Sequence, residues 1–221
     1  MKLQFIYGDM PFWRAEVGRL ALHFGEIEFD DIRINRDEFS YLKENGKLFN
    51  GTSIPFHQIP CLIVDNISIA QTGAIGRFCG KMSGLYPKNE PIEAARIDQY
   101  IDFVTDLNIL FSSTNNISDT AKKVFAREEL VLGFLKRKLN MLENCIPEDL
   151  EWVASNKISI ADIAIWRLIG WFTSGVIDGF PKDMIAVFPK LRNLCLAVDN
   201  HEKIQKWVQE TYPKNYPRGN Y

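Results

Sequence analysis

The sequence has few cysteines, and their spacing offers no obvious chemistry. Among 221 residues there are four, which lie far apart, form no C-x-x-C pair and have no histidine at metal-ligand spacing. This pattern indicates neither a disulfide framework nor a zinc site, and no metal is expected. We expect all four to be buried as small apolar side chains. They are Cys61, Cys79, Cys145 and Cys195.

The chain also lacks a strong net charge and a long apolar run. Its formal charge is -2 at pH 7, which provides no polycationic surface for a nucleic-acid backbone. The longest apolar stretch, residues 158–172, is interrupted by Asp162 and Arg167 and is too short to span a bilayer. Residues 1–9 contain no small-residue cleavage site, which argues against a secretory signal. We therefore expect a cytoplasmic protein with neither nucleic acid nor a membrane as a partner.

The first eighty residues alternate between strand and helix patterns. Short apolar runs predict four strands. They lie at residues 3–7, 28–34, 60–64 and 67–70. Apolar residues at helical spacing predict helices between them, around residues 17–24, 37–45 and 75–82. The resulting order, β-α-β, a helical segment and then β-β-α, is that of a thioredoxin-like α/β domain, which we place at residues 1–82.

The rest of the chain is predicted to be helical. Glycine, prolines and polar residues predict a linker at residues 83–90, and no convincing strand follows it. Apolar spacing predicts helices at residues 97–111, 131–142, 159–172, 189–198 and 202–210. The expected buried stripe of the second is Val131, Phe134, Leu135 and Leu142. The third is apolar around nearly its whole circumference, so it should be the central helix of an all-α domain at residues 91–221.

Two local patterns indicate a binding site. In Gln58-Ile59-Pro60 the proline opens an apolar run, where it removes no ladder donor. A cis bond there would turn the Ile59 backbone outward to pair with an extended peptide, whereas a trans, strand-opening proline is the structural alternative. Residues 71–75 start a helix, where the backbone N–H and hydroxyl of Thr72 would favour a carboxylate. The structural alternative is that Thr72 is simply the N-cap.

A third pattern is structural on any interpretation. Ser159 and Asp162 have the spacing of a capping box, in which the two side chains hydrogen-bond to each other's backbone N–H. Ile158 and Ile163 are placed to pack against each other as a hydrophobic staple. We therefore expect Asp162 to stabilise a helix and to take no part in chemistry.

Together and in this order, these segments and several others resemble the cytosolic glutathione transferases, closest to the sigma-like members, over nearly the whole chain. The segments that carry the resemblance are residues 19–23, 29–33, 58–60, 71–75, 84–87, 159–162, 166–168 and 188–191. The resemblance implies the glutathione transferase fold, a thioredoxin-like domain followed by an all-helical one. It also implies glutathione as co-substrate and a homodimer as the working unit.

The resemblance further implies roles for individual residues. Tyr7, at the end of the first strand, is similar to the catalytic tyrosine whose hydroxyl donates to the glutathione sulfur and favours the thiolate. Residues 8–13 contain no Ser, Thr or Cys that would compete with it. The implied glutathione-binding residues are Lys47, Gln58, Ile59, Pro60, Gln71, Thr72 and Asp102. Among these, Ile59 would pair through its backbone with the cysteinyl part, and Gln71 and Thr72 would hold the γ-glutamyl end.

Two of the implied glutathione-binding residues lie outside the segments 58–60 and 71–75. Lys47, or Lys43, would reach the glycyl carboxylate of glutathione. Asp102 would reach the γ-glutamyl amine held by the neighbouring subunit, and a solvated helix charge is its structural alternative. A small electrophilic, hydrophobic substrate would be held by Met10, Phe12 and Trp13, although burial also accounts for such aromatics.

The sequence departs from the family pattern in three places. The stretch from Tyr7 to Ala15-Glu16 is one residue longer, residues 49–53 lengthen the chain before Gln58, and His57 stands where the family commonly has glycine. These differences keep two other functions open. One is a non-catalytic structural protein or carrier of apolar ligands, and the other is a glutathione-dependent isomerase.

Overall fold

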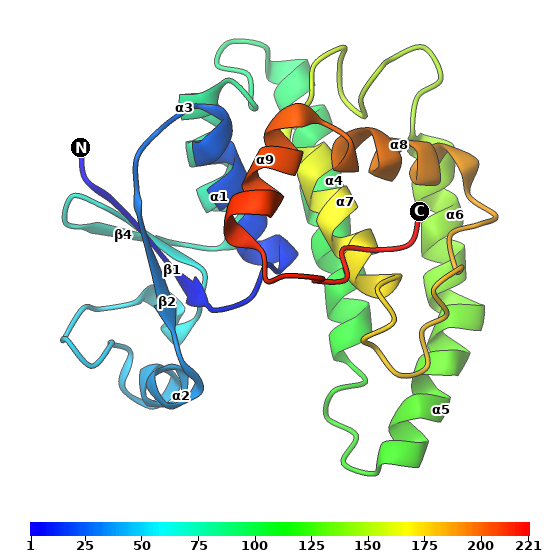
Figure 1. Cartoon of the computed structure of the whole chain (residues 1–221), viewed down its shortest axis with the longest axis horizontal. Helices are drawn as coiled ribbons and strands as arrows, with labels where there is room; N and C mark the ends of the chain where they lie inside the picture. The colour runs from blue at the N-terminus through cyan, green and yellow to red at the C-terminus, as the bar shows by residue number, and fades with distance from the viewer. The chain divides into compact units, whose positions relative to one another are not determined.

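In the computed structural model, which describes residues 1–221, the chain divides into two units, Met1–Asn89 and Glu90–Tyr221. The first unit contains the only sheet, with the strand order β2-β1-β3-β4 (Figure 1). Its strands are β1 (Leu3–Gly8), β2 (Asp30–Ile34), β3 (Cys61–Val64) and β4 (Ile67–Ala70). Its helices are α1 (Trp13–Phe24), α2 (Arg36–Asn45), the short 3-10 helix η1 (Pro55–His57) and α3 (Thr72–Ser83).

The strand pairing is that of a thioredoxin-like domain. β1 pairs with β2 in parallel, across the connection through α1, and pairs with β3 in the antiparallel direction. β3 and β4 form the expected hairpin, in which Asp65 adopts a left-handed conformation with φ 55°. The predicted α/β class of this half is therefore confirmed, with β2 two residues shorter at its start than the sequence pattern predicted.

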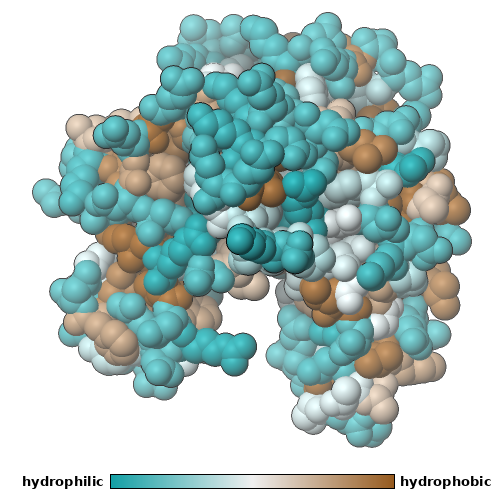
Figure 2. All heavy atoms as spheres, in the orientation of Figure 1, coloured by the Kyte–Doolittle hydropathy of each residue, from teal (hydrophilic) through white to brown (hydrophobic).

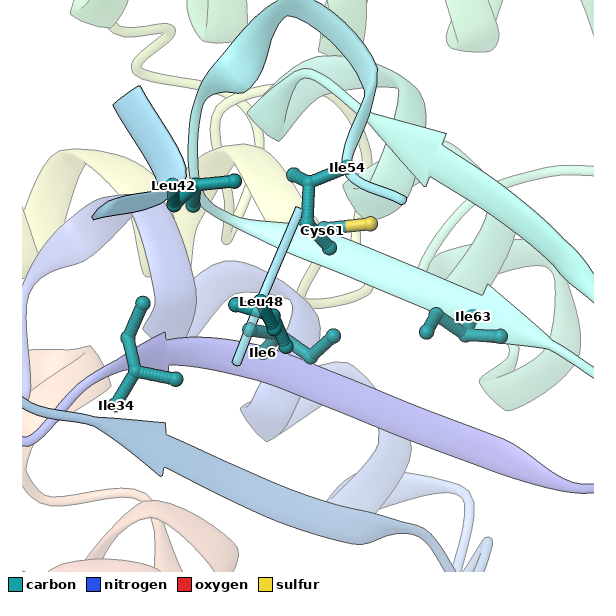
Figure 3. Close-up of a cluster of buried hydrophobic side chains, with 7 residues drawn as sticks. All are labelled: Ile6, Ile34, Leu42, Leu48, Ile54, Cys61 and Ile63. Atoms are coloured by element: carbon teal, nitrogen blue, oxygen red, sulfur yellow. The ribbon is translucent and has the colours of Figure 1, made fainter. Parts of the chain in front are cut away.

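Both faces of the sheet are covered. Helices α1 and α3 pack against each other on one face, where a Cβ at Gly18 of α1 would collide with Phe5. The other face carries a cluster of buried apolar side chains that extends from the strands to α2 and to the segment after it (Figure 3). The members of this cluster are Ile6, Ile34, Leu42, Leu48, Ile54, Cys61 and Ile63. The side chain of Ile59 packs against the same cluster, which fixes the start of β3.

The second unit is all-helical, as predicted. Its elements are α4 (Pro91–Ser112), α5 (Thr120–Leu130), the π-helical turn η2 (Val131–Leu135), α6 (Lys136–Cys145), α7 (Ile160–Phe172), α8 (Pro189–Asp199) and α9 (Glu202–Thr211). α7 contacts both α4 and α8, and twelve of its thirteen residues are buried. α7 is therefore the central helix that its apolar circumference predicts.

The capping box of α7 is present in full. The Asp162 carboxylate accepts hydrogen bonds from the Ser159 backbone N–H at 2.8 Å and from the Ser159 hydroxyl at 2.7 Å. Its second oxygen accepts from the backbone N–H of Val153 at 3.0 Å, so the carboxylate also ties the preceding loop to the helix. Burial raises the pKa of Asp162 to about 6, although these hydrogen bonds lower it.

Two expectations for the second unit are wrong. Phe134 is 62% exposed, whereas Val131, Leu135 and Leu142 are buried. The cause is the π-helical turn, whose wider winding changes which residues face inward. Cys145, at the end of α6, is exposed, while the other three cysteines are buried.

The face shown in Figure 2 is mainly polar, and exposed apolar side chains occur on both units. Exposed apolar residues of the second unit include Phe125 and Leu132, which lie close to Phe134 along the chain. None of the helices combines the length with the apolar composition that crossing a membrane requires.

Candidate functional site

Strand register brings the predicted binding residues of the first unit to one edge of the sheet. Cys61, the first residue of β3, lies opposite Ile6 of β1 and Ala70 of β4. β1 and β4 therefore end where β3 begins, and the helix α3 starts at the same place. The residues next in line along this edge are Tyr7, Pro60 and Gln71. We call this edge, with Ile59 and Thr72 beside it, the site edge.

The peptide bond between Ile59 and Pro60 is cis, so the trans alternative is wrong. Pro60 is buried, and Ile59 is half-buried with its side chain directed into the cluster of Figure 3. An anchored side chain leaves the backbone of Ile59 as the part of this residue that is available to a ligand. Gln58, one residue earlier, is exposed.

The start of α3 has the features of an anion site. Gln71 is the N-cap, with φ 74°, but its side chain does not cap the helix. Thr72 is the first residue of the helix, so the alternative in which it is a simple N-cap is wrong. Its side chain is 4% exposed, and its hydroxyl oxygen is buried without a hydrogen-bond partner in the chain. An uncapped helix start and an unpaired hydroxyl together suit a carboxylate.

Tyr7 lies almost buried at the end of β1, with 7% of its surface exposed. Burial raises the pKa of its phenol to about 12, although the nearby cations Arg14 and Arg19 lower it. The guanidinium of Arg19 lies 5.9 Å from the centre of the Tyr7 ring. With this pKa, the hydroxyl keeps its proton at neutral pH, so it acts as a hydrogen-bond donor.

Arg14 interacts electrostatically with Tyr7, and the sequence analysis did not single it out. It lies in the first turn of α1, where the guanidinium is 5.2 Å from the ring centre of Trp13. Burial lowers the pKa of Arg14, whereas its interaction with Tyr7 raises it. The sequence does carry a signal for this interaction, because Arg14 is a cation in the first turn of the helix that follows β1. Such a cation would favour a negative charge next to the Tyr7 hydroxyl.

The longer loop after Tyr7 is held to the sheet by an ion pair and to α1 by a hydrogen bond to its backbone. The Asp9 carboxylate accepts from Arg33 of β2 at 2.8 Å, and the Met10 carbonyl accepts from Arg19 of α1 at 3.4 Å. Both arginines also donate to Asp31, at 2.9 Å each. The Asp31 carboxylate thus binds both arginines that hold the loop. The loop with its extra residue therefore has a defined conformation.

The three residues predicted to hold the hydrophobic substrate differ in exposure. Met10 is 46% exposed and Phe12 is half-buried, so both present apolar surface. Trp13 is fully buried. The structure therefore does not favour direct contact between Trp13 and a substrate, and this side chain instead supports Phe12, whose ring centre lies 6.4 Å away.

The remaining predicted residues lie outside the site edge. Lys47 is exposed in the segment between α2 and η1 and pairs with Ser53 in an isolated bridge. Asp102 is exposed on α4, next to the buried Ile101. The contact of Asp102 with a partner subunit stays a prediction.

The chain is similar in sequence to known glutathione S-transferases and to a prostaglandin D synthase. Residues 106–211 match the family model described as glutathione S-transferase, C-terminal domain. The chain is 30% identical over 220 residues to glutathione S-transferase 2 of Manduca sexta, covering 97% of this chain and 99% of that protein. It is 25% identical over 197 residues to hematopoietic prostaglandin D synthase of Gallus gallus, covering 89% of this chain and 90% of that one.

Among solved structures, that of prostaglandin synthase D of Nilaparvata lugens superposes with a TM-score of 0.80. It is 26% identical and covers 96% of this chain and 99% of that chain. A thioredoxin-like unit with a polar site at the edge of its sheet, followed by an all-helical unit, defines the class of protein. Given the full-length similarity to the Manduca sexta enzyme, the chain belongs to the glutathione S-transferase family.

Proposed function

We propose that this protein is a tyrosine-type, sigma-like glutathione transferase that binds glutathione at the site edge and activates its thiol. The observation that carries the proposal is the buried Thr72 hydroxyl without a hydrogen-bond partner in the chain. Nearly all buried polar groups in native proteins are paired, so an unpaired one calls for an explanation. The γ-glutamyl carboxylate of glutathione would accept from this hydroxyl and from the amides at the start of α3.

The same edge suits the rest of the tripeptide. The backbone of Ile59, next to the cis bond, would pair with the cysteinyl part, and Gln71 would hold the γ-glutamyl end with Thr72. Gln58, which is exposed, would lie beside this pair, and the exposed Lys47, or Lys43, would reach the glycyl carboxylate. In this arrangement the cysteinyl sulfur would lie toward the end of β1, where Tyr7 is the last residue but one.

The chemistry then needs one strong hydrogen bond. Lowering the pKa of a thiol from about 8.5 to about 7 requires roughly 2 kcal/mol. A hydrogen bond to a charged acceptor supplies about 1.5 to 3 kcal/mol, so the Tyr7 hydroxyl is sufficient. The thiol proton leaves to solvent. The sulfur lone pair forms the bond to the electrophilic atom, and the leaving group departs with the electron pair of the broken bond.

A second candidate function is a glutathione-dependent isomerase. Two similar proteins carry the name prostaglandin D synthase or prostaglandin synthase D, which favours this alternative. Isomerisation would use the same thiolate, with the acceptor held against Met10 and Phe12. Product analysis with an endoperoxide and with an aryl halide distinguishes the two activities. A protein that binds glutathione but transforms neither class would be the non-catalytic carrier.

We also propose that the working unit is a cytoplasmic homodimer. Family membership supports this assembly, and the exposed position of Asp102 is compatible with a role in the partner's site. Light scattering of the purified protein and fractionation of cells test the two parts of this proposal.

The direct test of the glutathione site is Thr72→Val, which keeps the shape of the side chain and removes the hydroxyl. Because the hydroxyl has no partner in the chain, we expect the melting temperature to stay the same or rise. Glutathione affinity should fall about ten- to one-hundredfold, as for a lost hydrogen bond to a charged group. Calorimetric titration and thermal melting measure the two effects.

A matched control is Thr173→Val. Thr173 is fully buried on the second unit, and its hydroxyl donates to the Ile169 carbonyl and accepts from the Asn220 N–H, both at 3.0 Å. This variant should lose stability and keep its glutathione affinity. If Thr72→Val behaves like the control, the unpaired hydroxyl does not mark the ligand site.

A further inference from the structure

Two consecutive residues before the site edge adopt a conformation that side chains with a Cβ rarely adopt. Phe56 has φ 58° and His57 has φ 52°, both in the left-handed region. Glycine adopts this region freely and Asn, Asp and His enter it more often than other residues, but two successive residues with a Cβ persist there only where the surrounding structure holds them. His57 therefore needs an interaction that holds it in this conformation.

The compensating interaction joins His57 to the end of α2. The imidazole Nδ1 lies 3.2 Å from the backbone carbonyl oxygen of Lys43. Lys43 belongs to the last turn of α2, where carbonyl groups have no donor within the helix. Because a carbonyl oxygen only accepts, Nδ1 must carry the proton. The ring lies over Gly46, where a Cβ would collide with it.

The turn that carries His57 leads directly into the glutathione-pairing segment. His57 donates its backbone N–H to the Ile54 carbonyl at 3.3 Å, and Ile54 donates to the Gly46 carbonyl at 2.9 Å. The backbone bonds and the imidazole therefore hold the turn to the same end of α2. Only Gln58 separates His57 from Ile59. Rotation of the turn about its left-handed residues would move the Ile59 backbone away from the site edge.

We propose that His57 is a positioning residue for glutathione. Its Nδ1–H···O=C hydrogen bond to Lys43 keeps the left-handed turn in place, and the turn fixes the backbone with which the cysteinyl part of glutathione pairs. This inference rests on the proposed glutathione site. It assigns to the His57 imidazole a function that glycine at this position could not perform.

The test compares His57→Asn with His57→Gly. Both asparagine and glycine tolerate the left-handed region, so neither variant adds backbone strain. They differ in the hydrogen bond, because the Asn amide nitrogen is bonded to Cγ as Nδ1 is and can donate to the Lys43 carbonyl. We expect His57→Asn to keep the wild-type KM for glutathione. His57→Gly should raise that KM about two- to tenfold, the range of one neutral hydrogen bond, with the KM for an aryl halide unchanged.

Equal KM values for glutathione in His57→Asn and His57→Gly would overturn the inference. A lower melting temperature of His57→Gly with an unchanged KM for glutathione would overturn it as well. A second measurement needs neither variant. Nitrogen NMR of the wild type should show the neutral imidazole protonated at Nδ1, and protonation at Nε2 alone would overturn the hydrogen bond. Failure of the wild type to bind glutathione at all would instead refute the proposed function, and this positioning role with it.

Discussion

Replacing Asp162 by alanine removes a buried carboxylate that stabilises the central helix α7. In the wild type this group accepts from the backbone N–H groups of Ser159 and Val153 at 2.8 and 3.0 Å. Both residues are buried, so Asp162→Ala leaves two donors without a partner. Each unpaired donor costs about 1–3 kcal/mol, which together gives about 2–6 kcal/mol.

An opposite effect reduces this loss at neutral pH. Burial raises the pKa of Asp162 from 3.8 to about 6, so the charged form is disfavoured in the folded protein. At about 1.4 kcal/mol per pKa unit, removing this charge restores about 3 kcal/mol. The middle of the estimated loss, about 4 kcal/mol, minus this compensation leaves a net destabilisation of about 1 kcal/mol at pH 7. A protein of this size should then melt about 2–4 °C lower.

The pH dependence provides a sharper test than the magnitude. Because the folded-state pKa is above the unfolded one, the contribution of Asp162 is largest below pH 4 and is lost as pH rises through 6. Asp162→Ala should therefore destabilise the protein by about 1 kcal/mol more at pH 5 than at pH 7. Urea unfolding of both proteins at the two pH values measures this difference, in which the other titrating groups cancel.

An exposed cap provides the control. Asp119, the N-cap of α5, accepts from the Lys122 N–H at 2.8 Å at the surface, so Asp119→Ala should cost about 1 kcal/mol without leaving a buried donor. Equal losses for Asp162→Ala at pH 5 and pH 7 would refute the argument from burial. A native melting temperature with lost catalysis would refute the structural role itself.

Two predictions concern catalysis and glutathione binding. Tyr7→Phe should keep glutathione affinity within a few fold, lower turnover and raise the pH of thiolate formation by about 1–2 units, measured by thiolate absorbance. Tyr100→Phe is the control, because Tyr100 is also buried with a pKa of about 12 but donates to the Cys145 carbonyl at 2.6 Å. An unchanged pH profile of thiolate formation in Tyr7→Phe would exclude Tyr7 as the donor. Asp102→Ala should weaken glutathione binding by about 1–3 kcal/mol in titrations and leave a dimer in light scattering, whereas Asp106→Ala, one turn further on the same face, should bind normally. Normal glutathione binding by a monomeric wild type would refute the role of Asp102.

The sequence predicted most elements because their burial is regular. β1 and β3 are mostly buried and α7 is apolar on all sides, so the apolar pattern identifies them, whereas β2 and β4 have one buried residue each. Helix α5 escaped prediction because none of its residues is buried, which leaves no apolar stripe to detect. The predicted burial of Phe134 was wrong because a π-helical turn changes which residues face inward, and no residue type in this turn indicates it in the sequence.

The same distinction applies to the site. Tyr7, Pro60 and Thr72 lie at the ends of elements, so their position follows once the strands and the start of α3 are placed. The proximity of Arg14 to Tyr7 depends on how α1 packs on the sheet, and linear spacing does not report it. The hydrogen bond from His57 to Lys43 is also tertiary, because fourteen residues separate its partners.

Two of the departures from the family pattern, His57 and the loop after Tyr7, are attached to helices or strands of the first unit. The interactions that attach them differ in strength. His57 binds a carbonyl of α2 and lies over Gly46, so the turn before Ile59 is held by packing as well as by a hydrogen bond. The loop after Tyr7 depends partly on an ion pair between Arg33 and Asp9, whose side chains are 30% and 76% exposed. Exposed ion pairs contribute little, about 0–1 kcal/mol.

This difference in strength separates the two halves of the proposed function. The glutathione side, at Ile59 and Thr72, is fixed by a buried core and a helix start, so its geometry should resist sequence change. The acceptor side carries Met10 on a loop whose outer anchor is weak and screened by salt. Acceptor selectivity should therefore respond to ionic strength and to loop substitutions while glutathione affinity does not.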